Sequence, residues 1–218
     1  MESFKKRLKR YTDNEDLEIF GWLTVYLHNV YWSEIQTAKE NRLYHCVYLL
    51  THALMQMISE NLFGLTGKDG TKFYLENFVD GDTPDTRFSL ITDEIHDARN
   101  VMAHQGYSSL QHRVEYFANE IDEGWKNDGD SVLINPRLYA DRFEAAFRQG
   151  SLTAEYEKQT DEVRTVRKYQ YIRQWLRLDS KNPITIEIKK LEGCATLKDI
   201  RIQETVIQKM IYASYDLA

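Results

Sequence analysis

This chain of 218 residues has no long hydrophobic run and only two cysteines. No run of about 18 apolar residues occurs, so we expect no transmembrane helix. The basic stretch MESFKKRLKR is followed by no apolar segment, so we expect no secretory signal either. The only cysteines, Cys46 and Cys194, lie far apart and match no metal-ligand spacing. Two lone thiols without an export signal are typical of a reducing compartment, so we expect a cytoplasmic protein without membrane association.

Proline and glycine are also scarce, with 3 and 10 residues, which favours long regular elements over a turn-rich β-sandwich. Hydrophobic residues make up 42% and charged residues 28% of the chain, as in a globular protein rather than a disordered one. The net charge of −6 argues against a protein that coats nucleic acid with its whole surface. A small basic site remains compatible with that charge.

What the chain does have is helical periodicity over its first two thirds. Apolar residues recur at spacings of three and four over residues 15–39, 42–63, 85–105 and 108–125. Gly64 and Gly106 stand where two of these helices are expected to end. Between them, residues 64–85 form an irregular connection with one short helix over residues 72–79. Four long helices predict a mainly α fold, an antiparallel bundle around one apolar core.

The composition changes at KNDGDS, residues 126–131, which is polar and contains glycine. We therefore predict a helical bundle over residues 1–128 and a C-terminal extension of unknown role over residues 129–218. In the extension, SVLIN predicts a short strand, and PRLYADRFEAAFRQG predicts a helix that starts at its proline. Residues 160–178 and 197–217 predict helices, and PITIEIKKL alternates like a strand. The extension is thus helical or a small α+β part; it either stands apart or completes the core of the bundle.

The stretch ARNVMAHQGYS, residues 98–108, places an arginine, an amide and a histidine near the end of an apolar helix. Residues five apart on a helix point about 140° away from each other, so Arg99 and His104 meet only if the helix frays or turns at its end. Together with His96 and Asn100 they form a polar cluster. Arginine and histidine are also common at helix C-termini because of the helix dipole, so an ordinary terminus is the alternative interpretation.

The chemistry that this cluster fits is cleavage of an RNA phosphodiester without a metal. Histidine moves protons near neutral pH, and a guanidinium stabilises the charge that grows on the phosphoryl oxygens. The amide of Asn100 can orient the phosphate or the 2′-hydroxyl. Arg99, Asn100 and His104 would then be the catalytic residues. They supply one proton-transfer group per chain, and a second chain across a two-fold axis would supply another.

The segment RNVMAH resembles the R-x4-6-H motif of the HEPN family, in which a polar residue typically follows the arginine. The apolar segment ENRLYHCVYLLTHALMQMISENLF is similar to the second helix of that family, and the resemblance covers roughly residues 15–125. It implies an all-α homodimer with both motifs in one cleft, and a metal-independent endoribonuclease of toxin–antitoxin or phage-defence type without a cofactor. An antitoxin or a nucleotidyltransferase-like protein would be its partner. The alternative is a non-catalytic HEPN-like module that binds a partner protein or a nucleotide. The connection over residues 64–85 is longer than a minimal bundle needs, which puts substrate access in doubt.

Other polar residues have a functional and an ordinary interpretation. His96 and Asp97 could support the site by orienting its side chains, although a solvated helix face explains them as well. His45 and His52 could share a helix face, but no carboxylate falls at ligand spacing, so we expect no metal site. Basic residues over 5–10 and 164–177 could hold an RNA backbone, but the aromatic residues of the second segment have core-like spacing.

Overall fold

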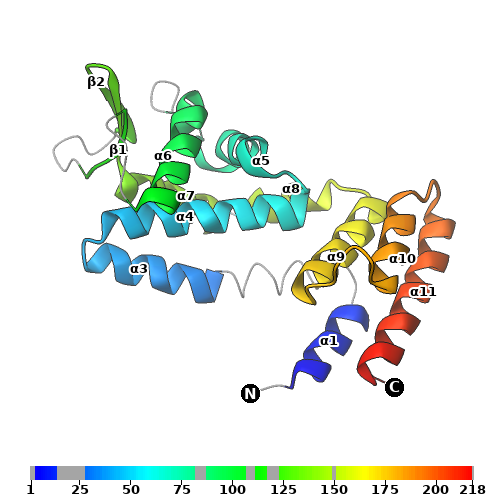
Figure 1. The fold of residues 1–218 in the computed structure, drawn as a ribbon. Helices are drawn as coiled ribbons and strands as arrows, with labels where there is room; N and C mark the ends of the chain where they lie inside the picture. Colours follow the sequence, from blue (N-terminus) through cyan, green and yellow to red (C-terminus); the bar gives the residue numbers. More distant parts are fainter. Residues whose placement is uncertain are drawn as a thin grey trace. The chain divides into compact units, whose positions relative to one another are not determined.

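The computed structural model describes residues 3–13, 28–81, 87–106, 111–116, 123–148 and 151–217. It is mainly helical with one three-stranded sheet, which confirms a mainly α fold (Figure 1). The chain divides into two compact units: unit 1 combines residues 1–23 with 157–218, and unit 2 comprises residues 24–156. The boundary predicted after residue 128 is based on a change in amino-acid composition, whereas this division is based on which residues pack together. Among the residues that the structure describes, none of the helices combines the length and apolar character that a membrane span needs.

Helix α4 (Tyr44–Ile58) forms the centre of unit 2 and continues as one π-helical turn, η2 (Ser59–Phe63). Gly64 then adopts a left-handed conformation with φ 70°, so the chain leaves the helix where the sequence predicts. Before α4, a π turn η1 (His28–Trp32) leads into α3 (Ser33–Glu40), which packs along α4 (Figure 1). This confirms the described part of the helix predicted over residues 15–39; residues 14–27 lie outside the described residues.

The connection after Gly64 is more regular than predicted, because α5 (Gly67–Tyr74) and the π turn η3 (Leu75–Val79) occupy most of it. The chain then forms a short 3-10 helix, η4 (Phe88–Ile91), and α6 (Thr92–Gln105), which packs on α4 and α5. The buried carboxylate of Asp80 accepts hydrogen bonds from the backbone N–H groups of Phe88 (2.7 Å) and Ser89 (3.1 Å). At the other end, Gly106 has φ 77° and donates to the carbonyl of Met102 (2.9 Å), so α6 ends where the sequence predicts.

The helix predicted over residues 108–125 is wrong in its described part. Strands β1 (His112–Val114), β2 (Trp125–Asp128) and β3 (Ser131–Ile134) form a sheet of order β1-β3-β2; residues 107–110 and 117–122 lie outside the described residues. β1 pairs with β3 in parallel, and β2 pairs with it in antiparallel orientation. Asp128 faces Ser131 across a two-residue turn in which Gly129 has φ 61°. The predicted strand in SVLIN is confirmed. One partner, β1, lies in the segment predicted as a helix, and the other, β2, lies mostly in the polar stretch after it.

Helix α7 (Pro136–Arg148) begins at its proline as predicted, and the side chain of Asn135 accepts hydrogen bonds from the next free backbone N–H groups. It packs along α4 and closes the core of unit 2. The largest buried side chains of that core are aromatic: Tyr48, Tyr74, Phe88, Tyr139 and Phe143. A short helix α8 (Ser151–Glu157) follows.

Unit 1 consists of α1 (Phe4–Asp13), α9 (Asp161–Trp175), α10 (Pro183–Glu192) and α11 (Leu197–Tyr215). Helices α9 and α11 confirm the helices predicted over residues 160–178 and 197–217, and β3 is the strand of the predicted extension over residues 129–218. The strand predicted from PITIEIKKL is wrong, because this segment is α10. Asn182 caps that helix by accepting from the N–H of Ile184 (2.9 Å), and Pro183 stands in its first turn.

A paired charge network lies inside unit 1. The ammonium of Lys168, only 5% exposed, lies 3.4 Å from a carboxylate oxygen of Glu204. Tyr169 donates to the same oxygen (3.2 Å), and Arg201 donates to the other one (2.8 Å). The carbonyl of Thr12, near the end of α1, accepts from Lys168 (3.3 Å). Lys168 is therefore a core residue and not part of an RNA-binding surface.

Candidate functional site

Arg99 and Asn100 form the polar pair at the middle of α6. The guanidinium of Arg99 donates to the side-chain oxygen of Asn100 (3.0 Å), and both side chains are half-buried. Among the described residues, no carboxylate comes within 4.0 Å of this guanidinium, in contrast to several other arginines of the chain. Those that pair with a carboxylate are Arg113, Arg137, Arg164 and Arg201. Arg99 is thus a half-buried cation without a counter-ion in the described part of the protein.

The other predicted site residues on α6 lie at different positions around the helix. His96 is half-buried and stands one turn before Arg99 and Asn100, on the same side of the helix. His104 and Asp97 are exposed. Because α6 stays helical through Gln105, the structure does not turn His104 back towards Arg99. The geometry therefore groups Arg99, Asn100 and His96, and leaves His104 apart.

A layer of buried polar rings from α4 and α7 lies behind this group. His52 is fully buried, and its Nδ1 lies 3.2 Å from the hydroxyl of Tyr139. Tyr48, one turn earlier on α4, donates to the carbonyl of Ile95 in α6 (2.5 Å). Burial, the positive charge of Arg99 and the charge of His96 together lower the pKa of His52 to about 3. His52 is consequently a neutral imidazole at neutral pH.

His52 and His96 bring two histidine rings close together in this layer, with centroids 6.3 Å apart. Nε2 of His52 and Nδ1 of His96 are both buried, and neither has a hydrogen-bond partner among the described residues. In the sequence, His52 stands out only as a possible metal ligand together with His45, which is exposed in the structure. One sequence signal could have revealed the layer: Tyr48 and His52 are four residues apart on a helix whose buried side is otherwise apolar except for Thr51.

The electrostatic character of this region is neutral to positive. Burial raises the pKa of Tyr48 and of Tyr139, so both phenols stay protonated. In the part of the chain that the structure describes, no three histidine, cysteine, aspartate or glutamate side chains come together as metal ligands. The chemistry that the arrangement favours is therefore binding of an anion at Arg99, with imidazole groups beside it.

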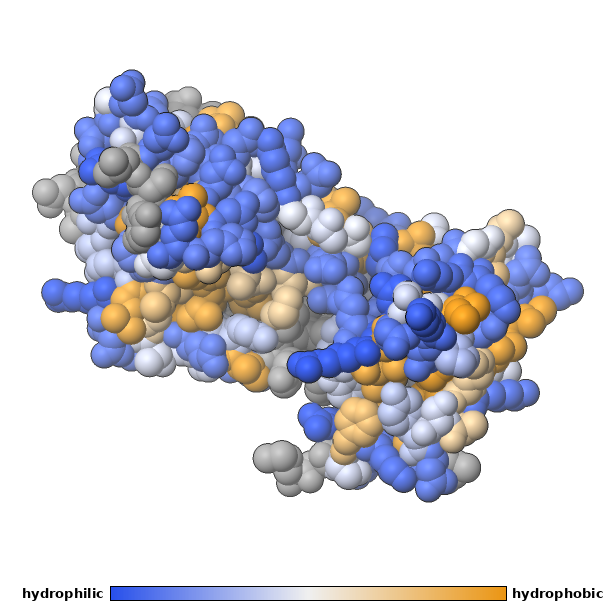
Figure 2. All heavy atoms as spheres, in the orientation of Figure 1, coloured by the Kyte–Doolittle hydropathy of each residue, from blue (hydrophilic) through white to orange (hydrophobic). Residues whose placement is uncertain are grey.

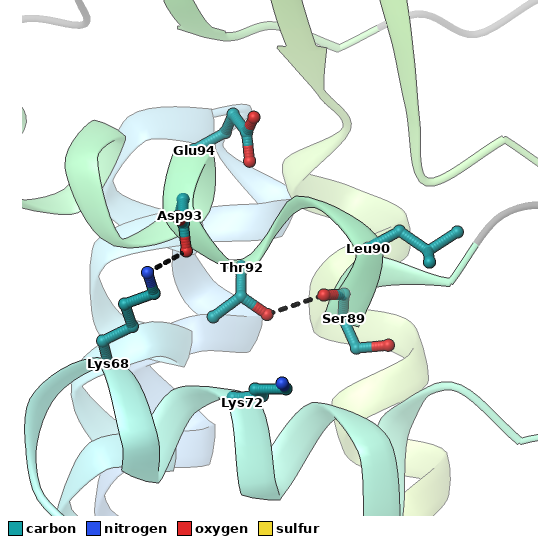
Figure 3. A pocket seen from close by; sticks show the side chains of 7 residues that line it. All are labelled: Lys68, Lys72, Ser89, Leu90, Thr92, Asp93 and Glu94. Atoms are coloured by element: carbon teal, nitrogen blue, oxygen red, sulfur yellow. Dashed lines mark hydrogen bonds and ion pairs between the residues drawn. The ribbon is translucent and has the colours of Figure 1, made fainter.

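A separate pocket of about 390 Å³ lies at the opposite end of α6, where α5 packs against it (Figure 3). Its lining consists of Lys68, Lys72, Ser89, Leu90, Thr92, Asp93 and Glu94. Figure 3 shows the ammonium of Lys68 directed at Asp93, and this hydrogen bond raises the pKa of Lys68. Two lysines and two carboxylates balance each other, so the pocket selects neither an anion nor a cation.

A hydrophobic band crosses the surface of unit 2 over the α4 region (Figure 2). On α4 the spacing of three and four residues produces a stripe that includes exposed or half-buried positions: Leu43, Cys46, Leu50, Ala53 and Met57. Leu43 is 53% exposed, and residues 43–59 contain no aspartate, glutamate, lysine or arginine. A helix face without charge over four turns is typical of a surface that packs against another protein. We refer to these five residues as the α4 stripe.

No family model, no curated protein and no solved structure matches this chain.

Proposed function

We propose that this protein is a metal-independent endoribonuclease whose site lies on α6, as its resemblance to the HEPN family implies. The observation that carries the proposal is the half-buried guanidinium of Arg99, which has no carboxylate partner among the described residues and is held by Asn100. Holding a cation in this state costs free energy, and an anionic ligand offsets that cost. A backbone phosphate of RNA has the charge and the planar pair of oxygens that a guanidinium binds.

The proposed residue roles follow from the chemistry of the phosphodiester. Arg99 binds the non-bridging oxygens and stabilises the charge that develops on them as the phosphorus is attacked. Asn100 fixes the direction of the guanidinium. His104 is proposed to transfer a proton; since it lies apart from Arg99 of its own chain, it acts at the Arg99 of a second protomer in the dimer. Because the layer behind Arg99 is buried and uncharged, the attraction between Arg99 and the phosphate is stronger than it would be in water.

The α4 stripe supports a homodimer as the active form. A second copy of the chain is the occupant that we propose for it, because the reaction needs two proton-transfer groups and an uncharged helix face can pack against its own copy. Ala53→Glu introduces a charge into the stripe and should convert the dimer into a monomer by light scattering at micromolar concentration. Leu90→Glu is the control, since Leu90 is 63% exposed and lies outside α4. A monomeric wild-type protein would contradict this assembly.

Incubation of the purified protein with total RNA tests the proposed activity directly. We expect cleavage that persists in a chelator and leaves 2′,3′-cyclic phosphate and 5′-hydroxyl ends. Arg99→Ala and His104→Ala should each reduce the rate by about 10² to 10⁴, because each removes a group that acts in the transition state. Their melting temperatures, measured in parallel, should change little. Cleavage that requires a divalent ion would contradict the mechanism, and a wild-type protein without cleavage would favour the non-catalytic binding module.

A further inference from the structure

The positions around α6 determine which histidine can share a phosphate with Arg99. With about 1.5 Å and 100° per residue, His96 lies about 4.5 Å from Arg99 along the helix axis and 60° around it. His104 lies about 7.5 Å away and 140° around the axis. The helix is regular up to Gln105 and is closed by the bond from Gly106 to Met102, so no local unwinding shortens the second separation. Within one chain, His96 is therefore the histidine placed to act on a phosphate that Arg99 holds.

The ring of His96 has an inner and an outer edge. Its Nδ1 is buried, while the residue as a whole is only half-buried, so Nδ1 points into unit 2 and Nε2 lies on the outer side. A histidine that accepts a proton from a ligand on the outer side needs a lone pair on Nε2, and hence its hydrogen on Nδ1. A hydrogen-bond acceptor on the inner side would fix this tautomer.

A buried ring beside this edge is His52, with its centroid 6.3 Å from that of His96; the structure contains no direct hydrogen bond between Nδ1 of His96 and Nε2 of His52. The hydroxyl of Tyr139 lies 3.2 Å from Nδ1 of His52 and 3.8 Å from the sulfur of Met55. A phenol has one proton, and when that proton is directed at the sulfur, the hydroxyl accepts from His52. Nδ1 of His52, 3.2 Å from that hydroxyl, then carries the hydrogen, and Nε2 carries a buried lone pair. The groups beside His52 are Tyr48 of α4, Tyr139 of α7, whose hydroxyl lies at Nδ1, and His96 and Arg99 of α6. His96 and Arg99 are the two on α6 that carry N–H donors.

We propose that His96 is the general base that acts together with Arg99, and that His52 is the positioning residue that selects its tautomer. This inference rests on the proposed ribonuclease function. His96 Nε2 takes the proton of the 2′-hydroxyl as the bond from the 2′-oxygen to phosphorus forms. The bond from phosphorus to the 5′-oxygen breaks, and that oxygen takes a proton from a protonated histidine, for which the dimer offers His104 of the second protomer. Oxidation states do not change, and the products are a 2′,3′-cyclic phosphate and a 5′-hydroxyl.

The first experiment measures kcat/KM for RNA cleavage against pH for the wild-type full-length protein and three variants. His96→Gln should reduce kcat/KM by about 100-fold or more and remove the acidic limb of the profile, because that limb reports the base. His104→Gln should retain the acidic limb. His45→Gln is the matched control, since His45 is exposed on α4 and belongs to neither group. A profile whose acidic limb survives in His96→Gln and disappears in His104→Gln would overturn the inference while leaving the ribonuclease function intact.

The second experiment does not depend on activity. Long-range ¹H–¹⁵N correlation spectra of the imidazoles report which ring nitrogen of His96 carries the hydrogen. We expect the Nδ1–H tautomer in the wild-type protein, the Nε2–H tautomer in His52→Leu, and recovery of the Nδ1–H tautomer in His52→Gln, which restores an acceptor. An Nε2–H tautomer of His96 in the wild type would overturn the role of His52. If no protein cleaves RNA but the spectra show the expected tautomers, the proposed function fails and the positioning by His52 stands.

Discussion

Each unit of this protein holds a cation away from full solvent contact, buried in unit 1 and half-buried in unit 2, and the surroundings of the two cations differ. In unit 1, Lys168 lies beside the carboxylate of Glu204, which also accepts from Tyr169 and Arg201. In unit 2, Arg99 has an amide as its hydrogen-bond partner and two imidazole rings nearby, but no carboxylate among the described residues. In unit 1 the positive charge of Lys168 is neutralised by a carboxylate of the protein itself. In unit 2 the positive charge of Arg99 remains, and an external anion can neutralise it.

This difference separates a polar cluster that holds a fold together from one that is available to a ligand. The network of unit 1 joins α1, α9 and α11 through side chains that are buried or bonded on both sides. Removing one member leaves an unpaired buried charge, which is strongly destabilising. The cluster of unit 2 already contains the unpaired charge, so removing Arg99 should relieve it. Stability should therefore fall strongly when the cluster of unit 1 loses its carboxylate and change little when the cluster of unit 2 loses Arg99.

The largest effect is expected from Glu204→Ala, which leaves the ammonium of Lys168 buried without its carboxylate. The free energy of unfolding should fall by about 3 to 5 kcal/mol, measured by urea denaturation. Lys189→Ala on the exposed face of α10 is the control and should change stability by less than about 0.5 kcal/mol. A loss for Glu204→Ala no greater than that of the control would mean that the ion pair of unit 1 is not structural.

The next effect is the pH dependence that His52 imposes on unit 2. Its pKa in the folded protein is about 3, below the ordinary value of 6.5, so only the unfolded chain binds a proton between these pH values. Stability contributed by neutral His52 is thus complete above pH 6.5 and falls by about 1.4 kcal/mol for each pH unit below it. Between pH 6.5 and 4.5, the wild type should lose roughly 2.3 kcal/mol more than His52→Phe. Parallel curves for the two proteins would show that His52 is not buried as a neutral ring.

A smaller effect is expected when phosphate is added. If Arg99 binds inorganic phosphate with a Kd near 1 mM, 10 mM phosphate should raise the free energy of unfolding by about 1.4 kcal/mol. Arg99→Met should not respond, and Glu204→Ala should respond like the wild type. Sodium chloride at the same ionic strength controls for screening. Equal responses of wild type and Arg99→Met would place the anion elsewhere on the protein.

The smallest effect is expected from Arg99→Met without added anion. Methionine retains much of the side-chain volume and removes the uncompensated charge, so the free energy of unfolding should change by less than about 1 kcal/mol. The measurement is the same urea titration that is used for Glu204→Ala. A loss comparable to that of Glu204→Ala would show that Arg99 is a structural residue and that the two clusters do not differ.

Helix ends were predictable from the sequence because their causes are local. Gly64, Gly106 and Pro136 act through their own backbone conformation, and each stands where the structure begins or ends a helix. The strand predicted over PITIEIKKL failed because isoleucine alternates there while the buried positions follow helical spacing: Ile184, Thr185, Ile188 and Leu191. Asn182 and Pro183 are typical of a helix N-terminus, and this local preference decides the structure of the segment in spite of the alternating isoleucines.

The sheet and the buried layer could not be predicted in the same way, because both depend on residues far apart in the sequence. β1 gains a partner only when β3 arrives beside it, and no property of His112–Val114 alone indicates this. Arg99 and Asn100 were identified from a local pattern, and their hydrogen bond agrees with it. The role of His52 depends on Tyr139 from α7, 87 residues later, so spacing on α4 could only indicate a shared helix face.

The closure of α1 against α11 has a consequence for how the chain is made. The carbonyl of Thr12 accepts from the side chain of Gln208 (2.9 Å), a residue 196 positions later. A ribosome that adds about 5 to 20 residues per second needs roughly 10 to 40 seconds to cover that distance. Unit 2 is continuous in sequence and is fully synthesised before α11 begins. During translation the nascent α1 therefore lacks its native partners until α9 and α11 have left the exit tunnel, and unit 1 is the part whose folding is most exposed to chaperones and proteases.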